Sequence, residues 1–600
     1  MGAFSVAQRQ IGGYNESHKK HNMQQYIYTE VDAIMYDNGK IYLGLSGEER
    51  VELPLSMCNR HGLIAGATGT GKTVTMKVLA ESLSDAGVPV FLCDVKGDVA
   101  GICAPGADSE DMQKRIERFG LTGKFAYRGY PTTFWDIYQT GGHAVRATVS
   151  EMGPELLSRI LGLSEAQTGV LQIVFRVADD RGLLLDDLKD LRALLNYVND
   201  HKEDYRMKYG NITTQSVAAI LRALLPLEKE GGELFFGEPA LDVNDWIRTD
   251  AEGRGMVNVL DCVKLVQNPT LYASFLLWLL SELFETMPEV GDLEKPKLVF
   301  FFDEAHMLFR DAPAVLVQKI EQTVKLIRSR GIGVFFVTQS PADVPNTVLA
   351  QLSNRVQHAL RAYTPTELKA VRVAAQAFRE NPAFNAEDAI MELGVGEALT
   401  SFLGEDGIPA MVQRTKIICP QSLMGAPEAM TRAKAILRDG MEKYDEAEDN
   451  VSAYEVLADE TQAAEEALAQ ERERLEEEKR AAEEEKQRRK QAEADEKRAQ
   501  KLEDEARRRA QKLEDEERRH AQRLEDEARR KAEREKEKKE AEEKRKAERI
   551  RSKIETQLIS AGGQMLKRGL LGILKKENAV RDPLRLLPAA KRAAPDRGGR

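Results

Sequence analysis

The sequence contains 600 residues with a net charge of −11, and 42% of them are hydrophobic, which is the content of a globular protein that buries a core. It holds no run of about 18 apolar residues, and its first ten residues lack the apolar centre of a signal peptide. We therefore expect a cytoplasmic protein with no membrane span. The negative charge gives the surface no general attraction for nucleic acid, so any such contact requires a local channel.

The chain begins with a short β-rich region. Alternating apolar residues in 40–45, with turn residues at 37–39 and 46–47, predict short strands. The region is too short for a full barrel. We expect residues 1–60 to form a small β-rich N-terminal cap.

Apolar strands alternate with helices between residues 61 and 425. A strand at 62–65, a glycine-rich loop, a helix at 72–86 and a strand at 89–94 open this region. Further strands are expected at 256–260, 298–302, 333–338 and 355–360, with helices at 271–285 and 315–330 and a closing strand pair at 398–403 and 411–417. Buried strands that alternate with helices predict an α/β core whose mainly parallel sheet is covered on both faces.

Two stretches depart from this alternation. Residues of about 140–235 have helical periodicity and no strand signal, and they are expected to form a helical insertion. Residues 426–452 are expected to form a linker.

The region 453–556 is dominated by charged residues. From Arg498 an eleven-residue repeat places leucine at 502, 513 and 524, and eleven residues over three turns give a nearly straight helix. Acidic and basic residues three or four apart support either a solvated single helix or a weak coiled coil. Residues 557–600 read as an amphipathic segment followed by a basic disordered tail. This end of the chain is a candidate docking segment for a protein, with membrane-surface or DNA contact as the alternative.

The glycine-rich loop matches the pattern GxxxxGK[ST] in full and lies between a predicted strand and a predicted helix. Its residues, with the first that follows, are Gly66, Ala67, Thr68, Gly69, Thr70, Gly71, Lys72, Thr73 and Val74. Glycines let backbone N–H groups surround phosphates, Lys72 reaches the β and γ oxygens, and the Thr73 hydroxyl binds magnesium. The pattern predicts a site for ATP and Mg²⁺.

Two later strands end in polar side chains at the edge of the sheet where ligands bind. Asp303 and Glu304 follow the apolar run 298–302, so we expect Asp303 to hold magnesium and Glu304 to orient or deprotonate the attacking water. A capping or ion-pair role is the alternative for either carboxylate. Gln339 ends the next strand and is a candidate γ-phosphate sensor, although a plain strand terminus needs no role.

Other charged residues near these strands are weaker candidates. The segment 94–98, Asp-Val-Lys-Gly-Asp, either touches magnesium and couples hydrolysis to movement or simply caps a helix through Asp98. Arg60, Arg328, Arg330 and Arg355 are candidates for stabilising the transferring phosphoryl group from a neighbouring subunit, although each also suits contact with solvent or a carboxylate.

On these residues the sequence resembles the HerA-like helicase family of the HerA/FtsK group of ring ATPases, and specifically its short bacterial YjgR-type branch. The matching stretches are NRHGLIAGATGTGKTVT (59–75), FLCDVKGDVAG (91–101), FFGEPAL (235–241), LVFFFDEAHMLF (298–309) and GVFFVTQSPADVPNTVLAQLSNRVQHALRA (333–362). The resemblance implies a RecA-like fold, ATP hydrolysis and a homo-hexameric ring. The implied phosphate-loop, carboxylate and sensor roles fall on Lys72, Thr73, Asp303, Glu304 and Gln339. The trans-acting arginines implied by the family fall on Arg60 and on Arg328 or Arg330.

Two features depart from the family pattern. The N-terminal region is shorter than the β-barrel domain that docks nucleases in archaeal relatives, and the long charged helix lies outside the pattern. DNA end-resection with a nuclease is therefore not expected from the resemblance.

Two functions follow as hypotheses. The first is an ATP-driven motor that threads or remodels double-stranded DNA through a hexameric ring. The second is a nucleotide-dependent switch or scaffold whose C-terminal region, residues 453–600, recruits a protein partner.

Overall fold

The structure is a computed structural model that describes residues 35–310, 312–499 and 507–562. The chain forms two compact units, Met1–Lys486 and Gln487–Arg600, which are described separately. The first 34 residues of the predicted N-terminal cap and most of the predicted tail 557–600 lie outside the described residues.

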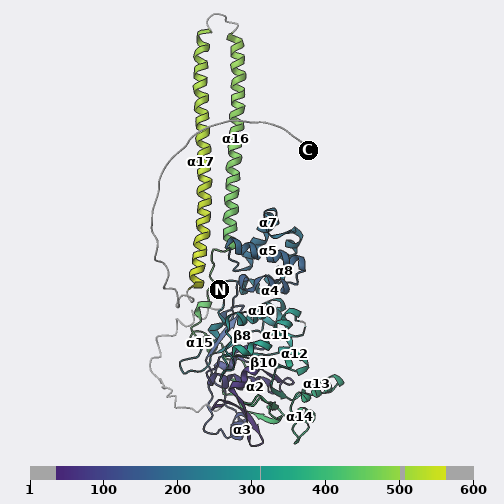
Figure 1. Cartoon of the computed structure of the whole chain (residues 1–600). Helices are drawn as coiled ribbons and strands as arrows, with labels where there is room; N and C mark the ends of the chain where they lie inside the picture. Colours follow the sequence, from purple (N-terminus) through teal and green to yellow (C-terminus); the bar gives the residue numbers. More distant parts are fainter. Residues whose placement is uncertain (1–34, 311, 500–506, 563–600) are drawn as a thin grey trace, which may run out of the picture. The chain divides into compact units, whose positions relative to one another are not determined.

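The strands described in the first unit join one sheet (Figure 1). Its parallel part has the order β11-β4-β10-β9-β5-β8-β6-β7, with the strands β4 (Gly62–Ala65), β5 (Val90–Asp94), β6 (Thr132–Asp136), β7 (His143–Ala144), β8 (Val257–Asp261), β9 (Leu298–Phe302), β10 (Ile332–Thr338) and β11 (Asn354–His358). One strand, β10, separates the strand before the glycine loop from the strand that ends in Asp-Glu. This is the RecA-like arrangement of a P-loop core, and the predicted α/β fold class is confirmed.

An antiparallel part extends the sheet beyond β11. It consists of β12 (Glu397–Ser401), β13 (Gln413–Ile417), β2 (Lys40–Ser46), β1 (Tyr36–Asp37) and β3 (Glu49–Pro54). The strands predicted as an N-terminal cap therefore continue the main sheet, because β2 pairs with β13.

Alternating side chains along the central strands build a core on each face of the sheet. In β9, Leu298, Phe300 and Phe302 join one apolar cluster, whereas Val299 and Phe301 join the other. The first cluster is covered by α10 (Pro269–Thr286) and α11 (Ala314–Leu326), and the second by α2 (Lys72–Asp85), α3 (Glu110–Arg118) and α15 (Ala429–Ile436). Short helices α12 (Asn346–Leu349), α13 (Pro365–Gln376) and α14 (Ala386–Glu392) follow the last parallel strands.

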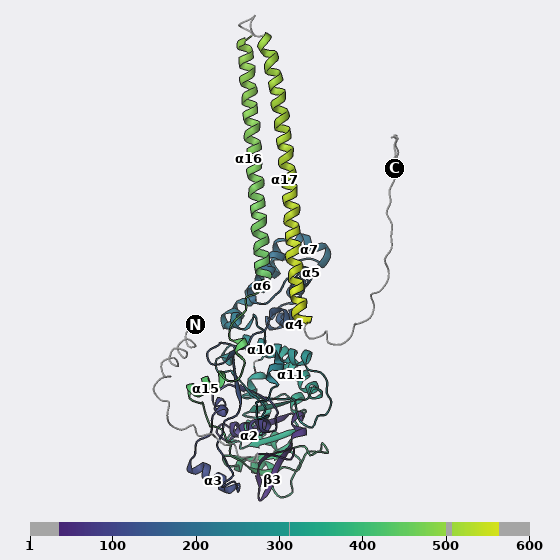
Figure 2. The ribbon, with the colours of Figure 1, turned by 90° about the vertical axis from the view of Figure 1, so that its left-hand side faces the viewer.

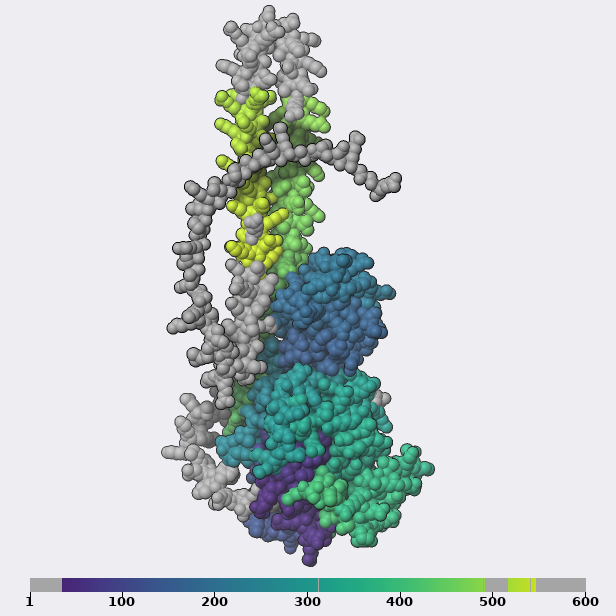
Figure 3. Space-filling model, in the orientation of Figure 1, coloured from purple at the N-terminus to yellow at the C-terminus, as the bar shows by residue number. Residues whose placement is uncertain are grey.

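The region predicted as a helical insertion forms a separate lobe of the first unit (Figure 3). It contains α4 (Val149–Ile160), α5 (Glu165–Arg181), α6 (Leu188–Asp200), α7 (Lys202–Tyr209), α8 (Thr214–Leu227) and α9 (Glu233–Phe235). Helix α4 packs on α10, on the side away from the sheet in both ribbon views (Figures 1 and 2). The lobe shares the apolar cluster of α10 and α11, so it is attached firmly to the core.

The segment 426–452 was predicted to be a linker, but it packs on the core. It includes α15 and the buried side chains of Ile436, Met441 and Tyr444. Two side chains that follow α15, Asp439 and Asp445, contact the ring of His143 on β7. No local pattern indicated this packing, because the residue that Asp439 and Asp445 contact, His143, lies about 300 positions earlier in the chain.

The charged region 453–556, predicted as a single helix or a coiled coil, contains α16 (Ala453–Ala499) and most of α17 (Arg507–Gly562), and residues 500–506 lie outside the described part. The first turns of α16 are anchored on the insertion by buried Ala453 and Leu457 and by the Arg181–Glu460 ion pair. Whether this region is solitary or pairs stays a prediction. Among the described helices, none is long and apolar enough to cross a membrane.

Candidate nucleotide-binding site

The glycine loop joins β4 to α2 and has the backbone conformation that its glycines permit. Gly66, Gly69 and Gly71 all have positive φ angles, of 153°, 77° and 117°. A side chain at Gly66 would place its Cβ atom 2.4 Å from the Cβ atom of His358. The loop is held to the neighbouring strands because the Gly66 amide donates to the Thr338 carbonyl at 3.2 Å.

Lys72 begins α2 and folds back over the loop. Its ammonium donates to the carbonyls of Gly66 at 2.7 Å and Ala67 at 3.2 Å. Burial lowers the pKa of Lys72, with the Glu304 carboxylate acting in the opposite direction. The Lys72 ammonium is buried beside the glycine loop, where it contacts carbonyl oxygens. A bound phosphate would give it an anionic partner, which is a stronger hydrogen-bond acceptor than a carbonyl.

Asp303 lies at the end of β9 with its side chain buried. One carboxylate oxygen, Oδ1, accepts a hydrogen bond from the Glu304 amide at 2.9 Å, whereas Oδ2 has no hydrogen-bond partner among the described residues. Burial raises the pKa of Asp303 to about 6. An unpartnered buried carboxylate oxygen is costly alone and fits a Mg²⁺ ligand, for which hard oxygen donors are preferred.

Glu304 is surrounded by polar side chains from three strand ends. Its Oε1 atom forms an ion pair with Lys96, its Oε2 atom accepts from the Gln339 amide at 3.4 Å, and His306 Nδ1 lies 3.2 Å from Oε2. Burial acts to raise the pKa of Glu304, but the Lys96 ammonium holds it below its usual value. The structure thus brings Glu304 and Gln339 together, as the sequence pattern predicted, and adds Lys96 as a direct partner.

His358 is a site residue that sequence reasoning missed. It ends β11 beneath the glycine loop, where its Nδ1 atom donates to the Glu397 carbonyl at 2.9 Å and its Nε2 atom lies 2.8 Å from the Thr75 hydroxyl. Burial lowers its pKa to about 4, so the ring is neutral at pH 7 and Nε2 accepts from Thr75. Its position at the end of a strand that flanks β4 was the available signal.

Three of the candidate arginines, Arg60, Arg328 and Arg330, lie at the opposite edge of the sheet. Arg60 directly precedes β4, and Arg328 and Arg330 directly precede β10, whereas the glycine loop follows the carboxyl end of β4. Arg60 and Arg328 both pair with Asp292, at 3.2 Å and 3.3 Å. None of the three lies near the nucleotide site of its own chain, and Arg60 and Arg328 show the carboxylate contact that was the alternative to action in trans, which stays a prediction.

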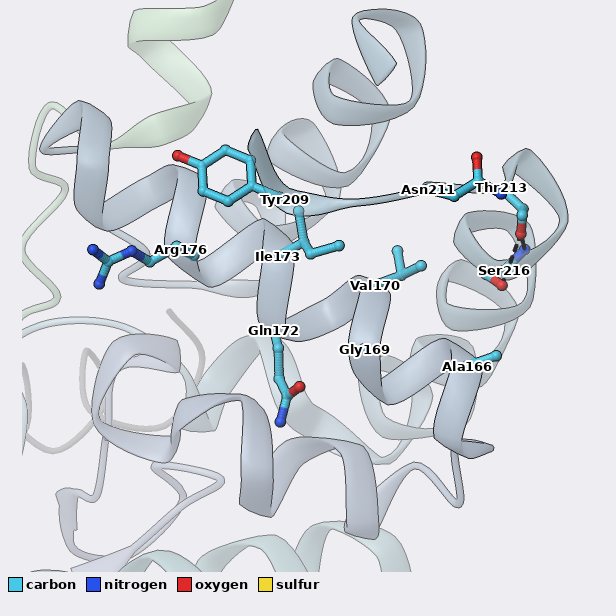
Figure 4. A pocket seen from close by; sticks show the side chains of 10 residues that line it. All are labelled: Ala166, Gly169, Val170, Gln172, Ile173, Arg176, Tyr209, Asn211, Thr213 and Ser216. Atoms are coloured by element: carbon cyan, nitrogen blue, oxygen red, sulfur yellow. Dashed lines mark hydrogen bonds between the residues drawn. The ribbon is translucent and has the colours of Figure 1, made fainter. Parts of the chain in front are cut away.

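A hollow in the insertion lobe is separate from these residues. It has a volume of about 600 Å³ and is lined by α5 and by the segment from Tyr209 to Ser216 (Figure 4). Its lining includes apolar Val170 and Ile173 and polar Gln172 and Thr213, and it contains none of the phosphate-loop or carboxylate residues.

The glycine loop, the Asp303–Glu304 pair and the strand order define a P-loop ATPase with a RecA-like core. The family profile described as "Helicase HerA-like C-terminal" matches residues 43–506, and the chain belongs to this HerA-like helicase family. The bacterial branch within the family stays a prediction.

Two curated relatives match this chain over similar lengths. The chain is 23% identical over 387 residues to "Probable helicase MJ1565" of Methanocaldococcus jannaschii, which covers 62% of this chain and 67% of the relative. It is 21% identical over 380 residues to "DNA double-strand break repair helicase HerA" of Sulfolobus acidocaldarius, covering 61% and 68%.

Solved structures with a related fold include the plasmid coupling protein TrwB in complex with the non-hydrolysable GTP analogue GDPNP. This match has 15% identity, covers 63% of this chain and 90% of TrwB, and has a TM-score of 0.44. VirB4 of Thermoanaerobacter pseudethanolicus matches with 16% identity over 66% of this chain and 99% of its own, with a TM-score of 0.40.

Proposed function

We propose that the protein is a homo-hexameric motor that hydrolyses ATP at the site containing Lys72 and Glu304. It uses the free energy of hydrolysis to translocate on or remodel double-stranded DNA. The observation that carries this proposal is the meeting of a glycine loop with a buried, unpartnered carboxylate oxygen of Asp303 at one sheet edge. Family membership and the helicase names of two relatives support DNA as the polymer.

Each residue of the site has a separate task in hydrolysis. The amides of residues 66–74 and the Lys72 ammonium would hold the phosphates, and the Thr73 hydroxyl and the Asp303 carboxylate would hold Mg²⁺. Bound magnesium supplies positive charge that neutralises the phosphate oxygens. Glu304 accepts a proton from the attacking water, and Gln339, which already contacts Glu304, orients that water.

The ATPase rate with and without DNA tests the proposal. We expect double-stranded DNA to raise the rate at low salt, because phosphate contacts weaken steeply as salt rises. Lys72→Ala and Glu304→Gln should each lower the rate at least about a hundredfold. Lys114→Ala, at an exposed lysine of α3, is the matched control and should leave the rate unchanged. A wild-type ATPase that DNA fails to stimulate would remove the DNA motor from consideration.

The hexamer and the trans role of the arginines have a joint test. A double Arg328→Ala, Arg330→Ala variant keeps an intact phosphate loop, whereas Glu304→Gln keeps intact arginines. If the arginines serve a neighbouring subunit, mixed assemblies should regain ATPase activity that neither variant has alone. Activity no greater than the sum of the separate variants would contradict action in trans. Particle mass measured on the same samples checks for six copies.

A nucleotide-dependent scaffold is the second candidate. It is favoured by the firm seating of α16, where Ser452 Oγ donates to Asp190 at 2.5 Å and Arg181 holds Glu460. Such anchoring lets a change in the core reach the charged helix. A chain truncated after residue 486 distinguishes the candidates. DNA-stimulated ATPase activity in the truncated chain would support the motor, whereas an ATPase rate that DNA leaves unchanged in both chains would support the scaffold.

A further inference from the structure

Lys96 lies on a loop with a defined shape at the edge of the nucleotide site. The loop follows β5, and Asp94 at the end of that strand accepts hydrogen bonds from the amides of Gly97 at 2.7 Å and Ala100 at 3.0 Å. Gly97 has a φ angle of 80°, which turns the chain sharply after Lys96. The loop backbone is therefore fixed, while the Lys96 side chain is 44% exposed and can change rotamer.

The Lys96 ammonium is placed among the charges of the site. It pairs directly with Glu304 Oε1, and the nearby Asp303 and Asp98 carboxylates also act on it. Burial acts to lower the pKa of Lys96, but the Glu304 bond and these carboxylates raise it, so the group stays charged. Lys96 also acts electrostatically on Lys72, so both ammonium groups belong to the same phosphate-binding region.

Two consequences follow from this placement. A carboxylate paired with an ammonium is a weak base, so Glu304 in the observed arrangement is poorly suited to take a proton from water. In addition, Arg60, Arg328 and Arg330 lie at the far edge of the sheet. Among the described lysine and arginine side chains of this core, Lys96 forms an ion pair with a carboxylate of the site, and His306 Nδ1 lies 3.2 Å from the other oxygen of the same carboxylate.

We propose that Lys96 is a γ-phosphate-responsive positioning residue, which holds Glu304 when no γ-phosphate is present and transfers its ammonium to the γ-phosphate when ATP binds. This inference rests on the proposed hydrolysis of ATP at this site. A terminal phosphate carries more negative charge than one carboxylate, so it competes successfully for the flexible lysine. ADP lacks this group, and Lys96 stays on Glu304.

Transfer of Lys96 prepares the site for hydrolysis. Glu304 keeps its Gln339 contact on Oε2, while Oε1 becomes free to accept a proton. Water attacks the γ-phosphorus atom, the bond from that atom to the β–γ bridging oxygen breaks, and Glu304 takes the proton from the water. The products are ADP and phosphate. When phosphate leaves, Lys96 returns to Glu304 and the base is blocked again.

Binding of nucleotides to the full-length chain tests this inference without turnover. The probes are Mg²⁺ with ADP and Mg²⁺ with a non-hydrolysable ATP analogue, measured by calorimetry. We expect Lys96→Met to weaken the analogue about ten- to a hundredfold, as for loss of one charged hydrogen bond, and ADP less than about threefold. Lys96→Arg should restore much of the analogue affinity. Lys264→Met is the matched control, since Lys264 is an exposed lysine on the adjacent loop, 3.8 Å from the Tyr138 ring.

A double-mutant cycle separates the exchange from a structural role. Glu304→Gln removes the competing carboxylate, so it should strengthen analogue binding in the wild-type background and have no effect in the Lys96→Met background. Equal losses for ADP and the analogue in Lys96→Met, or unchanged affinity for both, would overturn the inference. A wild-type chain that binds neither nucleotide would instead refute the proposed function.

Discussion

His143 offers a test of how the segment before α16 is held to the core. Its side chain is fully buried on β7, where Nδ1 lies 2.6 Å from Asp445 and Nε2 lies 2.9 Å from Asp439. Burial acts to lower the pKa of His143, but the two carboxylates raise it above its usual value. The ring is therefore a charged clamp between two acidic residues of the 437–452 segment.

Replacing this clamp with a neutral side chain should be costly. The side chain introduced by His143→Gln can donate to one carboxylate, but it leaves the other without a charged partner. Asp439, for example, has only 2% of its side chain exposed. Breaking a buried pair in this way costs about 3–5 kcal/mol. For a cooperative unit of roughly 450 residues, whose unfolding entropy is about 0.9 kcal/mol per kelvin, the melting temperature should fall by roughly 3–5 °C.

The pH dependence gives the sharper check. Because the folded pKa lies above the unfolded value near 6.5, the clamp stabilises fully below about pH 6.5 and is lost as pH rises through the folded pKa. The difference in melting temperature between wild type and His143→Gln should therefore be largest near pH 6 and shrink toward alkaline pH. Differential scanning calorimetry across this range measures it, with limited proteolysis of 437–452 as a local readout.

A control and a refuting result complete the experiment. Asp449→Asn removes an exposed carboxylate of the same segment, 3.9 Å from Lys189, and should leave the melting temperature unchanged. A difference for His143→Gln that is independent of pH, or that widens as pH rises, would refute the charged clamp.

Two further predictions use the same physical arguments. Gly66→Ala should abolish nucleotide binding, because its Cβ atom would lie 2.4 Å from His358. Gly69→Ala, with open space around it, should weaken binding less. Titration with a fluorescent nucleotide compares the two variants, and equal effects would contradict the steric argument. Arg181→Ala removes two hydrogen bonds from one guanidinium nitrogen to both carboxylate oxygens of Glu460, at 2.7 Å and 2.8 Å. Hydrogen exchange in the first turns of α16 should become roughly tenfold faster. Unchanged exchange would show that the ion pair does not anchor these turns.

Most of the parallel sheet could be predicted because its strands are apolar on both faces. Runs such as Leu298–Phe302 and Ile332–Thr338 contribute side chains to both apolar clusters, and short apolar runs of five to seven residues are typical of buried strands. Strand β6, Thr132–Asp136, was missed because its polar side chains conceal its burial. Thr132 donates to the Tyr130 carbonyl at 2.9 Å and Trp135 to Asn258 at 3.0 Å, so their polarity is satisfied inside the core.

The site was predictable only where its residues are adjacent in sequence to a strand end. The glycine loop and the Asp303–Glu304 pair each form a short sequence pattern that indicates their chemistry, so they could be predicted from the sequence alone. Contacts between strand ends depend on strand order instead. Lys96 meets Glu304 because β5 pairs with β9, and His358 meets Gly66 because β11 pairs with β4. The segment 94–98 was already a candidate from the sequence, but the contact of Lys96 with Glu304 and that of His358 with the glycine loop follow from the strand order.

The arginines show the same dependence in reverse. Arg330 precedes Gln339 by few residues, but the seven residues of β10 at about 3.3 Å each separate them by roughly 23 Å across the sheet. Closeness in sequence across a strand therefore means opposite edges of the sheet. An arginine at the amino edge is far from the nucleotide site of its own chain, whereas Lys96 reaches Glu304 from a different strand end. Lys96 is therefore placed in the chain's own site, and a role of the arginines at the site of another copy stays a prediction.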